Sequence, residues 1–576
     1  MERIGVLPDD VLLDIFDFYE GMNRKKGPEP LVVEKTRVEA WQLLVHVCRR
    51  WRSVVFQSSS RLNLHLYCTA ETPARDTLDV WPALPLLIGA HGSSMTSTPG
   101  MDNIIVALGQ SNRVRQVALW GLVDWQLEKV LAAMHVPFPE LIILDLAPDK
   151  KTLPVIPIPD SFLGGSASRL KHFELSGIPF PGLPKLVLSA THLVRLHLSD
   201  IPHSGYISPE AIVAVLSALS NLEIFSLRFR SPQSRPDRES RILLPPKRSI
   251  LTSLNRFGFK GVTEYLEDLL TFIDVPHLDY MEIDFFNQVD FDCPRLARFI
   301  NRTPSLRALD EAHVHFNDIS ASVGLRYRPS ESGSNNILID ISCREPDWQL
   351  SSVEQVCNFP LRPLFTVEDL YIEHRYSKLV WKNDAIENFL WLQLLLPFTA
   401  VKNLHLSKEF APGIAVALLD VVGDRITVVM PSLQNIFVEA LEPSGPFQEN
   451  IAQFVTARQL SGLPVAISAW NKGEVGEGSA SSCMHSALVS IGRDADIFIL
   501  VCAQRRNWGG FFGSIYELGS ATEVRSIGPQ VSPQGQEERQ GPKGSVDLAQ
   551  HVCLDDTGQL QYLLNCHDVV VHFALL

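Results

Sequence analysis

The segment LVRLHL, Leu193 to Leu198, places leucines at its first, fourth and sixth positions. The last two are separated by one residue, which is the spacing of side chains on one face of a β-strand. The same spacing of apolar residues recurs along the chain, so one short strand is predicted at each copy. The ten other copies begin at Val114, Leu141, Leu170, Leu222, Leu254, Leu278, Leu306, Val367, Val401 and Leu433.

The copies return at a nearly regular interval. Between Val114 and Leu306 they start about 27 residues apart, inside the range of leucine-rich repeats. Proline lies two residues before the first anchor in FPEL, VPHL, TPSL and MPSL, where it ends one helix and precedes the next strand. The longer gap after Leu306 contains a weak copy around Ile339 and Ile341, which predicts one irregular repeat.

The segments between copies have the pattern of amphipathic helices. In ISPEAIVAVLSALSNL, from Ile207, Ser208 is placed to cap a helix and Pro209 to begin it. TEYLEDLLTFI from Thr263 and CPRLARFINRT from Cys293 are similar. No such unit buries its apolar face alone, whereas a stack of units does. The predicted fold class is α/β, an irregular leucine-rich-repeat solenoid of parallel strands with helices on the convex side.

A small all-helical module is predicted before the repeats. LPDDVLLDIFDFY, residues 7–19, has apolar positions at helical spacing and acids in its first turn, and VEAWQLLVHVCRRWRSVVF, residues 38–56, predicts a second helix. LPDDVLLDIF followed by VCRRWRSVVF resembles the F-box motif. The matching residues are Leu7, Pro8, Asp10, Ile15, Phe16, Val47, Cys48 and Trp51.

One departure from the motif is the longer spacing between its two halves. The surplus, about a dozen residues, falls in MNRKKGPEPLVVEK, a predicted loop extension or extra turn. With the repeats, the resemblance implies a substrate receptor of a cullin-RING, SCF-type ubiquitin ligase. Its partners would be a Skp-type adaptor with its cullin scaffold and a protein target that the sequence does not identify.

The resemblance also implies roles for residues of the module. It places Val47, Cys48 and Trp51 in the core, with Arg49, Arg50 and Arg52 toward solvent. The implied adaptor-binding residues are Leu7, Pro8, Asp10, Leu12, Ile15, Phe16 and Trp51.

The polar residues between the anchors are the candidates for target binding, because they alternate with the buried positions of each strand. These candidates are His172, Glu174, Arg195, His197, Arg228, Asp284, Glu373 and His405. The alternative is a non-ligase interaction scaffold whose F-box-like helices only cap the solenoid. Exposure of Leu7 and Pro8 distinguishes the two, since a cap buries the pair and a receptor presents it.

Three regions are expected: residues 1–60 as the F-box helical module, 61–470 as the solenoid and 471–576 as a partly disordered tail. Alternating Leu62, Leu64 and Leu66 predict the strand that starts the solenoid. In the tail, HSALVSIGRDADIFILVCAQ and QLQYLLNCHDVVVHFALL have the composition of strands, and no function is assigned to them.

Composition limits the function classes. A net charge of −14 argues against nucleic-acid or anionic-membrane binding. The apolar segment from Phe389 to Val401 is too short to span a bilayer, and the first residues lack a signal-peptide core, so a cytoplasmic or nuclear protein is expected.

Site chemistry is limited in the same way. The nine cysteines include no C-x-x-C pair, and Cys483 with His485 and Cys566 with His567 lack zinc-site spacing. Nucleophile, phosphate-loop and metalloprotease motifs are missing from the sequence. No catalytic residue, cofactor or metal is therefore expected.

Overall fold

The computed structural model describes residues 7–24, 40–149, 156–234, 248–288, 291–307, 309–327, 336–374, 388–421, 427–439 and 446–470, and short strands between 485 and 570. The chain divides into two compact units, Met1–Arg505 and Arg506–Leu576. The second unit contains two antiparallel pairs among its described residues, β21 Val552–Leu554 with β22 Leu560–Tyr562 and β23 Asn565–Cys566 with β24 Val569–Val570. Most of the predicted disordered tail lies outside the described residues.

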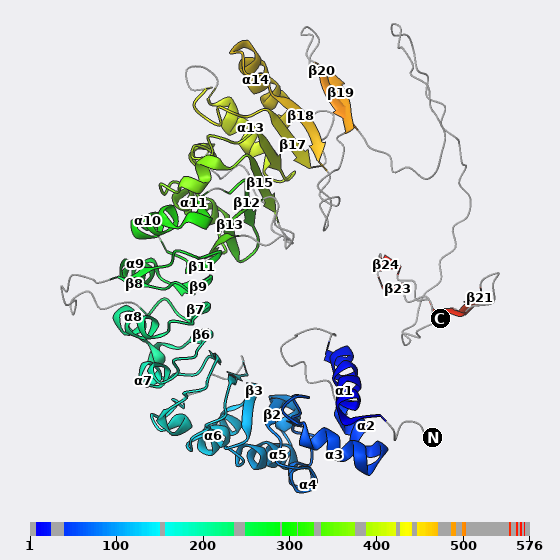
Figure 1. Cartoon of the computed structure of the whole chain (residues 1–576). Helices are drawn as coiled ribbons and strands as arrows, with labels where there is room; N and C mark the ends of the chain where they lie inside the picture. Colours follow the sequence, from blue (N-terminus) through cyan, green and yellow to red (C-terminus); the bar gives the residue numbers. More distant parts are fainter. Residues whose placement is uncertain are drawn as a thin grey trace, which may run out of the picture. The chain divides into compact units, whose positions relative to one another are not determined.

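The described part of the first unit is built on one sixteen-stranded sheet (Figure 1). Neighbouring strands are parallel throughout, except at β13, so the predicted α/β class with a long parallel-strand sheet is confirmed. The strands are β1 Leu66–Cys68, β2 Leu86–His91, β3 Val114–Leu122, β4 Ile143–Pro148, β5 His172–Ser176, β6 Arg195–Ile201, β7 Ile224–Phe229, β9 Arg256–Gly261, β11 Tyr280–Phe286, β12 Glu311–Phe316, β13 Ser320–Arg326, β14 Ile337–Ser342, β15 Asp369–His374, β16 Asn403–Leu406, β17 Asn435–Glu439 and β18 Ala466–Trp470.

Helices connect most of these strands and lie on one side of the sheet (Figure 1). They are α4 Ala74–Val80, α5 Thr98–Leu108, α6 Asp124–Ala133, α7 Leu183–Leu188, α8 Pro209–Ala218, α9 Thr263–Phe272, α10 Pro294–Arg302, α11 Pro346–Cys357, α12 Asn388–Leu395, α13 Ala411–Leu419 and α14 Pro446–Leu460. Short 3-10 turns occur at Gly92–Met95, Phe162–Gly165, His203–Gly205, Pro304–Leu306 and Arg362–Thr366. Ser208 caps α8 as predicted, because its hydroxyl accepts a hydrogen bond from the Ala211 amide at 3.3 Å.

Ten of the eleven predicted copies end in strands of this sheet. Leu193, Leu196 and Leu198 are each at most 2% exposed, and the residues between them point to the other side of the sheet. The chain therefore has a leucine-rich-repeat-like solenoid fold. We call the sheet face opposite the helices the open face. It carries the residues that alternate with the anchors, which are half-buried on most strands and buried on β12 and β13.

The region between β11 and β15 differs from the prediction. Instead of one irregular repeat, β12, β13 and β14 form an antiparallel set, and the spatial order is β11-β14-β13-β12-β15. The copy predicted at Leu306 was wrong in phase, since Leu306 ends a 3-10 turn and the strand begins at Glu311. Its buried anchors are Leu309, Ala312 and Val314, shifted by three residues.

The start of the sheet also lies later than predicted. Leu62 and Leu64 are buried but precede the strand, which spans only Leu66–Cys68. The next strand, β2, pairs between β1 and β3 and was not predicted. Its sequence, LPLLIGA from Leu84, has alternating apolar residues along the strand. It lacks the leading apolar anchor that starts each copy of the repeat pattern, so it was not recognised as a copy.

The described residues of the N-terminal region form three helices where two were predicted: α1 Asp9–Arg24, α2 Ala40–Val47 and α3 Arg49–Gln57. The predicted second helix breaks at Cys48, whose backbone is extended (φ −160°, ψ 170°). Its sulfur accepts a hydrogen bond from the Trp51 amide at 3.5 Å and so caps α3. Residues 25–39, which contain most of the long connection, lie outside the described residues.

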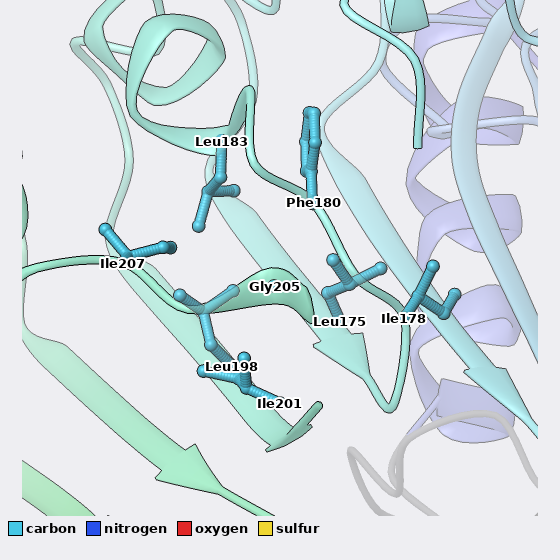
Figure 2. A pocket seen from close by; sticks show the side chains of 8 residues that line it. All are labelled: Leu175, Ile178, Phe180, Leu183, Leu198, Ile201, Gly205 and Ile207. Carbon is cyan, nitrogen blue, oxygen red and sulfur yellow. The ribbon is translucent and has the colours of Figure 1, made fainter. Parts of the chain in front are cut away.

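A small cavity lies beside β5, β6 and the turn at His203–Gly205 (Figure 2). It measures about 10 Å³ and its lining is apolar, with Leu175, Phe180 and Leu198 among the side chains. That volume accommodates at most one water, and a water needs polar partners. The cavity is a packing gap in the core, too small for a ligand.

Two short strand pairs complete the first unit: β8 Ser249–Ile250 with β10 Ile273–Asp274, and β19 His485–Ser490 with β20 Phe498–Cys502. Among the described helices, none has the length and apolarity needed to cross a membrane. The apolar segment around α12 instead buries Trp391 and Leu395 in the core.

Candidate functional site

Helix α1 has two apolar faces. Leu12 and Phe16 are fully buried, and Phe16 packs edge-on against Trp51 of α3, with ring centroids 4.8 Å apart. Val11, Ile15 and Phe18 are 38%, 47% and 71% exposed and follow each other at spacings of four and three residues. Because that spacing places them on one side of the helix, they form an exposed apolar stripe.

The predicted adaptor-binding residues divide between these faces. Pro8, Asp10 and Ile15 are exposed, Leu7 and Trp51 are half-buried against the core, and Leu12 and Phe16 are buried. Exposed Val11 and Phe18 were not predicted, although their helical spacing with Ile15 was visible in the sequence.

The core that the motif resemblance implied for the N-terminal helical module is wrong in part. Val47 is 59% exposed and Cys48 is exposed, because the break between α2 and α3 turns both outward. Arg50 donates to Asp9 at 2.7 Å and to the Leu7 carbonyl oxygen, which ties α3 to the start of α1. Arg52 donates to the Val45 carbonyl oxygen at 3.0 Å.

The same helices contact the beginning of the sheet. Trp41 of α2 lies 5.1 Å from Trp81, ring to ring, and Phe56 of α3 lies 6.4 Å from it. Trp81 directly follows α4. The module therefore covers part of the first repeat and keeps the α1 stripe exposed.

Five of the predicted target-binding residues lie on adjacent strands of the open face. His172 and Glu174 on β5 lie directly opposite Arg195 and His197 on β6, and the Arg195 and Glu174 side chains are 3.5 Å apart. Arg228, on the next strand, is half-buried. Burial lowers the pKa of both histidines, so their neutral forms are favoured.

Arg228 connects this group to β11, two strands farther along the sheet. Its guanidinium contacts Glu282 at 2.7 Å and Asp284 at 3.0 Å. The predicted candidate Asp284 is thus held in an ion pair with the predicted candidate Arg228.

The remaining candidates, Glu373 on β15 and His405 on β16, lie beyond the β12–β14 insertion. His405 belongs to a stack of rings across four strands: His313–Tyr371 at 4.4 Å, Tyr371–His405 at 4.1 Å and His405–Phe437 at 4.5 Å, each within 12° of parallel. We call His313, Tyr371, His405 and Phe437 the aromatic ladder. Trp470 on β18 packs against His405 at 5.3 Å.

A chain of side-chain amides runs beside the aromatic ladder. The Asn435 amide donates to Asn403 at 2.8 Å, and the Asn403 amide donates to Asp369 at 2.7 Å. These bonds join β17, β16 and β15, and they fix the strands that carry the ladder.

Three pairs of carboxylates stand directly opposite each other on neighbouring strands of the open face. The pairs are Asp145 with Glu174, Asp284 with Asp340 and Glu311 with Asp369. Like charges in register destabilise a sheet. We call them the acidic pairs. One carboxylate of each pair contacts an arginine of this chain: Glu174 contacts Arg195, Asp284 contacts Arg228 and Glu311 contacts Arg326.

Burial sets the ionisation of several of these acids. It raises the pKa of Asp145 to about 6, despite a hydrogen bond from the Trp120 indole, and it raises that of Asp340 to about 6, with Asp284 adding to the shift. For Glu311, burial also acts to raise the pKa, but hydrogen bonds from His313 and Arg326 outweigh it and lower the value to about 2.

Replacing Asp145 with asparagine is expected to stabilise the fold more at pH 7.5 than at pH 4.5. The native carboxyl keeps its proton up to about pH 6, whereas an unfolded aspartate loses it near pH 4, so the wild type loses stability as pH rises between these values. Asparagine stays neutral and keeps an oxygen for the Trp120 N–H, 2.6 Å away. Thermal unfolding at both pH values measures the difference.

The control is Asp79→Asn, since Asp79 is exposed on α4. Its effect on the melting temperature should be small at both pH values, because most surface changes have little effect. A gain for Asp145→Asn that does not depend on pH would contradict the assignment.

Sequence reasoning missed His313, His315, Tyr371 and Trp470. The segment HVH at 313–315 has its two histidines on one face if it is a strand, but the misphased copy at Leu306 placed the strand earlier. Trp470 was recognised only as the end of the repeats. The register between β12 and β15 places His313 opposite Tyr371 and His315 opposite Glu373, and Tyr371 in turn lies opposite His405.

Comparison with known proteins finds a likeness in structure but not in sequence. No family model matches the chain, and no curated protein matches its sequence. Among solved structures, it is similar to the leucine-rich repeat-containing protein LegL7 from Legionella pneumophila, with 12% identity, a TM-score of 0.23, and coverage of 69% of this chain and 98% of that one. At these values the likeness carries no functional argument.

Proposed function

We propose that this chain is the substrate-recognition subunit of an SCF-type ubiquitin ligase. In this proposal the N-terminal helices are an F-box that binds a Skp-type adaptor on a cullin scaffold, and the open face binds a protein target. Partner enzymes transfer ubiquitin, so the chain itself has no catalytic role.

The observation that carries the proposal is the exposed stripe on α1. A helix that only closes the end of a solenoid needs one apolar face, whereas α1 has Leu12 and Phe16 inside and Val11, Ile15 and Phe18 outside. Of the pair whose exposure distinguishes a receptor from a cap, Pro8 is exposed and Leu7 is half-buried against the core, so the pair alone favours neither. An apolar patch of this kind favours a protein partner, and the resemblance of LPDDVLLDIF to the F-box motif specifies the adaptor.

The open face supports target binding by its chemistry. Tyr371, His405 and Trp470 are half-buried and supply ring surfaces of the type that anchors protein interfaces, whereas His313 and Phe437 are each 8% exposed. The acidic pairs add six carboxylates, three of which contact arginine side chains. A complementary target surface presents lysine or arginine side chains around an apolar centre.

A second candidate is a non-ligase interaction scaffold in which the helices serve as a cap. The contacts of Trp41 and Phe56 with Trp81 favour it, because terminal repeats need a cover for their apolar end. Capping and adaptor binding use different faces of the module, so the two roles are compatible in one protein.

The test is direct binding of the purified full chain to a purified Skp-type adaptor bound to its cullin fragment. We expect a 1:1 complex in size-exclusion chromatography, with a Kd of about 1 µM or tighter by calorimetry. No complex at about tens of micromolar would reject the ligase proposal and favour the scaffold. A repeat at higher salt separates this apolar interaction from charge-driven association.

A further inference from the structure

Three potential metal ligands converge where β12 meets β15. His313 and His315 are two residues apart on β12, so both lie on the open face. Glu373 on β15 lies directly opposite His315. One donor atom from each of the three lies within 4.8 Å of the other two. Their side chains are only 10%, 5% and 9% exposed.

We propose that His313, His315 and Glu373 bind a divalent transition-metal ion, with Zn²⁺ as the preferred metal. Two imidazole nitrogens and one carboxylate oxygen are a common three-residue ligand set for Zn²⁺. Imidazole donors disfavour Ca²⁺ and Mg²⁺, which prefer oxygen ligands.

The distances suit a tetrahedral ion. Bonds of about 2 Å place tetrahedral donors about 3.3 Å apart. Nδ1 of His315 and Oε2 of Glu373 are already 3.1 Å apart. The donor of His313 lies within 4.8 Å of both, so binding requires this ring to move toward them by up to about 1.5 Å.

The surroundings hold the ligands in orientation. Nε2 of His313 lies 3.5 Å from Oε2 of Glu311, and a carboxylate on one nitrogen is the usual outer partner of a metal-bound histidine. Tyr371 stacks on the His313 ring at 4.4 Å and an angle of 3°. Arg326 donates to Glu311 in turn, which keeps that carboxylate in place.

A metal here has a structural consequence. It would link β12 to β15 at the point where the antiparallel strands β12, β13 and β14 interrupt the series of parallel repeats. Three protein ligands also leave one coordination position, which water or a side chain of a bound partner can occupy.

The experiment uses the full chain, first stripped with a chelator and then titrated with Zn²⁺ in a calorimeter. We expect one ion per chain with a Kd of about 1 µM or tighter. Co²⁺ should occupy the same site and give visible absorption bands of a tetrahedral complex that Zn²⁺ displaces. Zn²⁺ should also raise the melting temperature, since it binds the folded state.

Variants of the proposed ligands test whether His313, His315 and Glu373 are responsible for the Zn²⁺ binding. His315→Ala and Glu373→Gln should each weaken binding at least ~10-fold, because losing a ligand costs at least as much as losing its outer partner. The matched control is His197→Ala, a histidine of the same face on β6, which should bind like the wild type. Glu373→Gln preserves the size of the side chain. If His315→Ala unfolds, the Zn²⁺ affinity of Glu373→Gln alone tests whether the ion binds at this site. Absence of saturable binding, or equal affinity of Glu373→Gln and His197→Ala, would overturn the proposal.

Discussion

Replacing Ile15 with aspartate should weaken binding of the Skp-type adaptor roughly 100-fold and leave the fold intact. Ile15 is 47% exposed at the middle of the α1 stripe, so its loss leaves no cavity in the core. In a complex, the new carboxylate would be buried without a partner, and the apolar contact would be lost. Together these effects are worth about 3 kcal/mol or more, which is roughly a 100-fold rise in Kd.

Calorimetric titration measures the affinity, and thermal unfolding verifies the fold. Leu188→Asp is a matched control, because Leu188 on α7 is also 47% exposed and undergoes the same kind of change away from the module. Phe16→Ala is the contrasting variant: it should lower stability, since Phe16 is fully buried against Trp51. Equal affinities for Ile15→Asp and Leu188→Asp would show that the stripe is not the adaptor surface.

Replacing Phe257 with alanine should destabilise the solenoid by about 3 to 5 kcal/mol, the usual cost for a buried phenylalanine. Phe257 is fully buried on β9, and its ring centroid is 6.0 Å from that of Phe225 on β7. The change removes contacts with both neighbouring repeats, and stability in a stack depends on those interfaces. Urea unfolding followed by circular dichroism measures the shift in midpoint.

Phe389→Ala provides the matched control on α12, where the side chain is 59% exposed. Its cost should stay within about 0.5 kcal/mol, as for most surface changes. If the two variants unfolded at the same urea concentration, the stacked core would not be the source of stability that the burial of Phe257 implies.

The sequence predicted most of the fold because the repeat is local. The three leucines of LVRLHL specify one strand by their spacing, and stacking then requires the copies to lie side by side. Ser208 and Pro209 likewise mark the start of α8 by rules that act within one turn. Such features need no knowledge of distant contacts.

The features that were missed depend on distant pairing. Nothing local to Glu311 or Ile337 shows that β14, not β12, pairs with β11, because both strands have alternating apolar residues. The break at Cys48 was missed since the residues around it have continuous helical spacing. The candidate residues alternate with the buried anchors of their strands, and the neighbours of His405 and Glu373 follow from the strand register across the β12–β14 insertion.

The reversed order of β12, β13 and β14 has a consequence for synthesis on the ribosome. Strands up to β11 can pair as they emerge, since each neighbours its predecessor in the sheet. The outer edge of β11 then waits for β14, so residues 287–342 must be translated first, which takes roughly 3 to 11 s at 5–20 residues per second. During that interval the nascent chain presents an open strand edge, a template for association with other chains. Fast translation of this stretch, or a chaperone that shields the edge, would therefore raise the yield of folded protein.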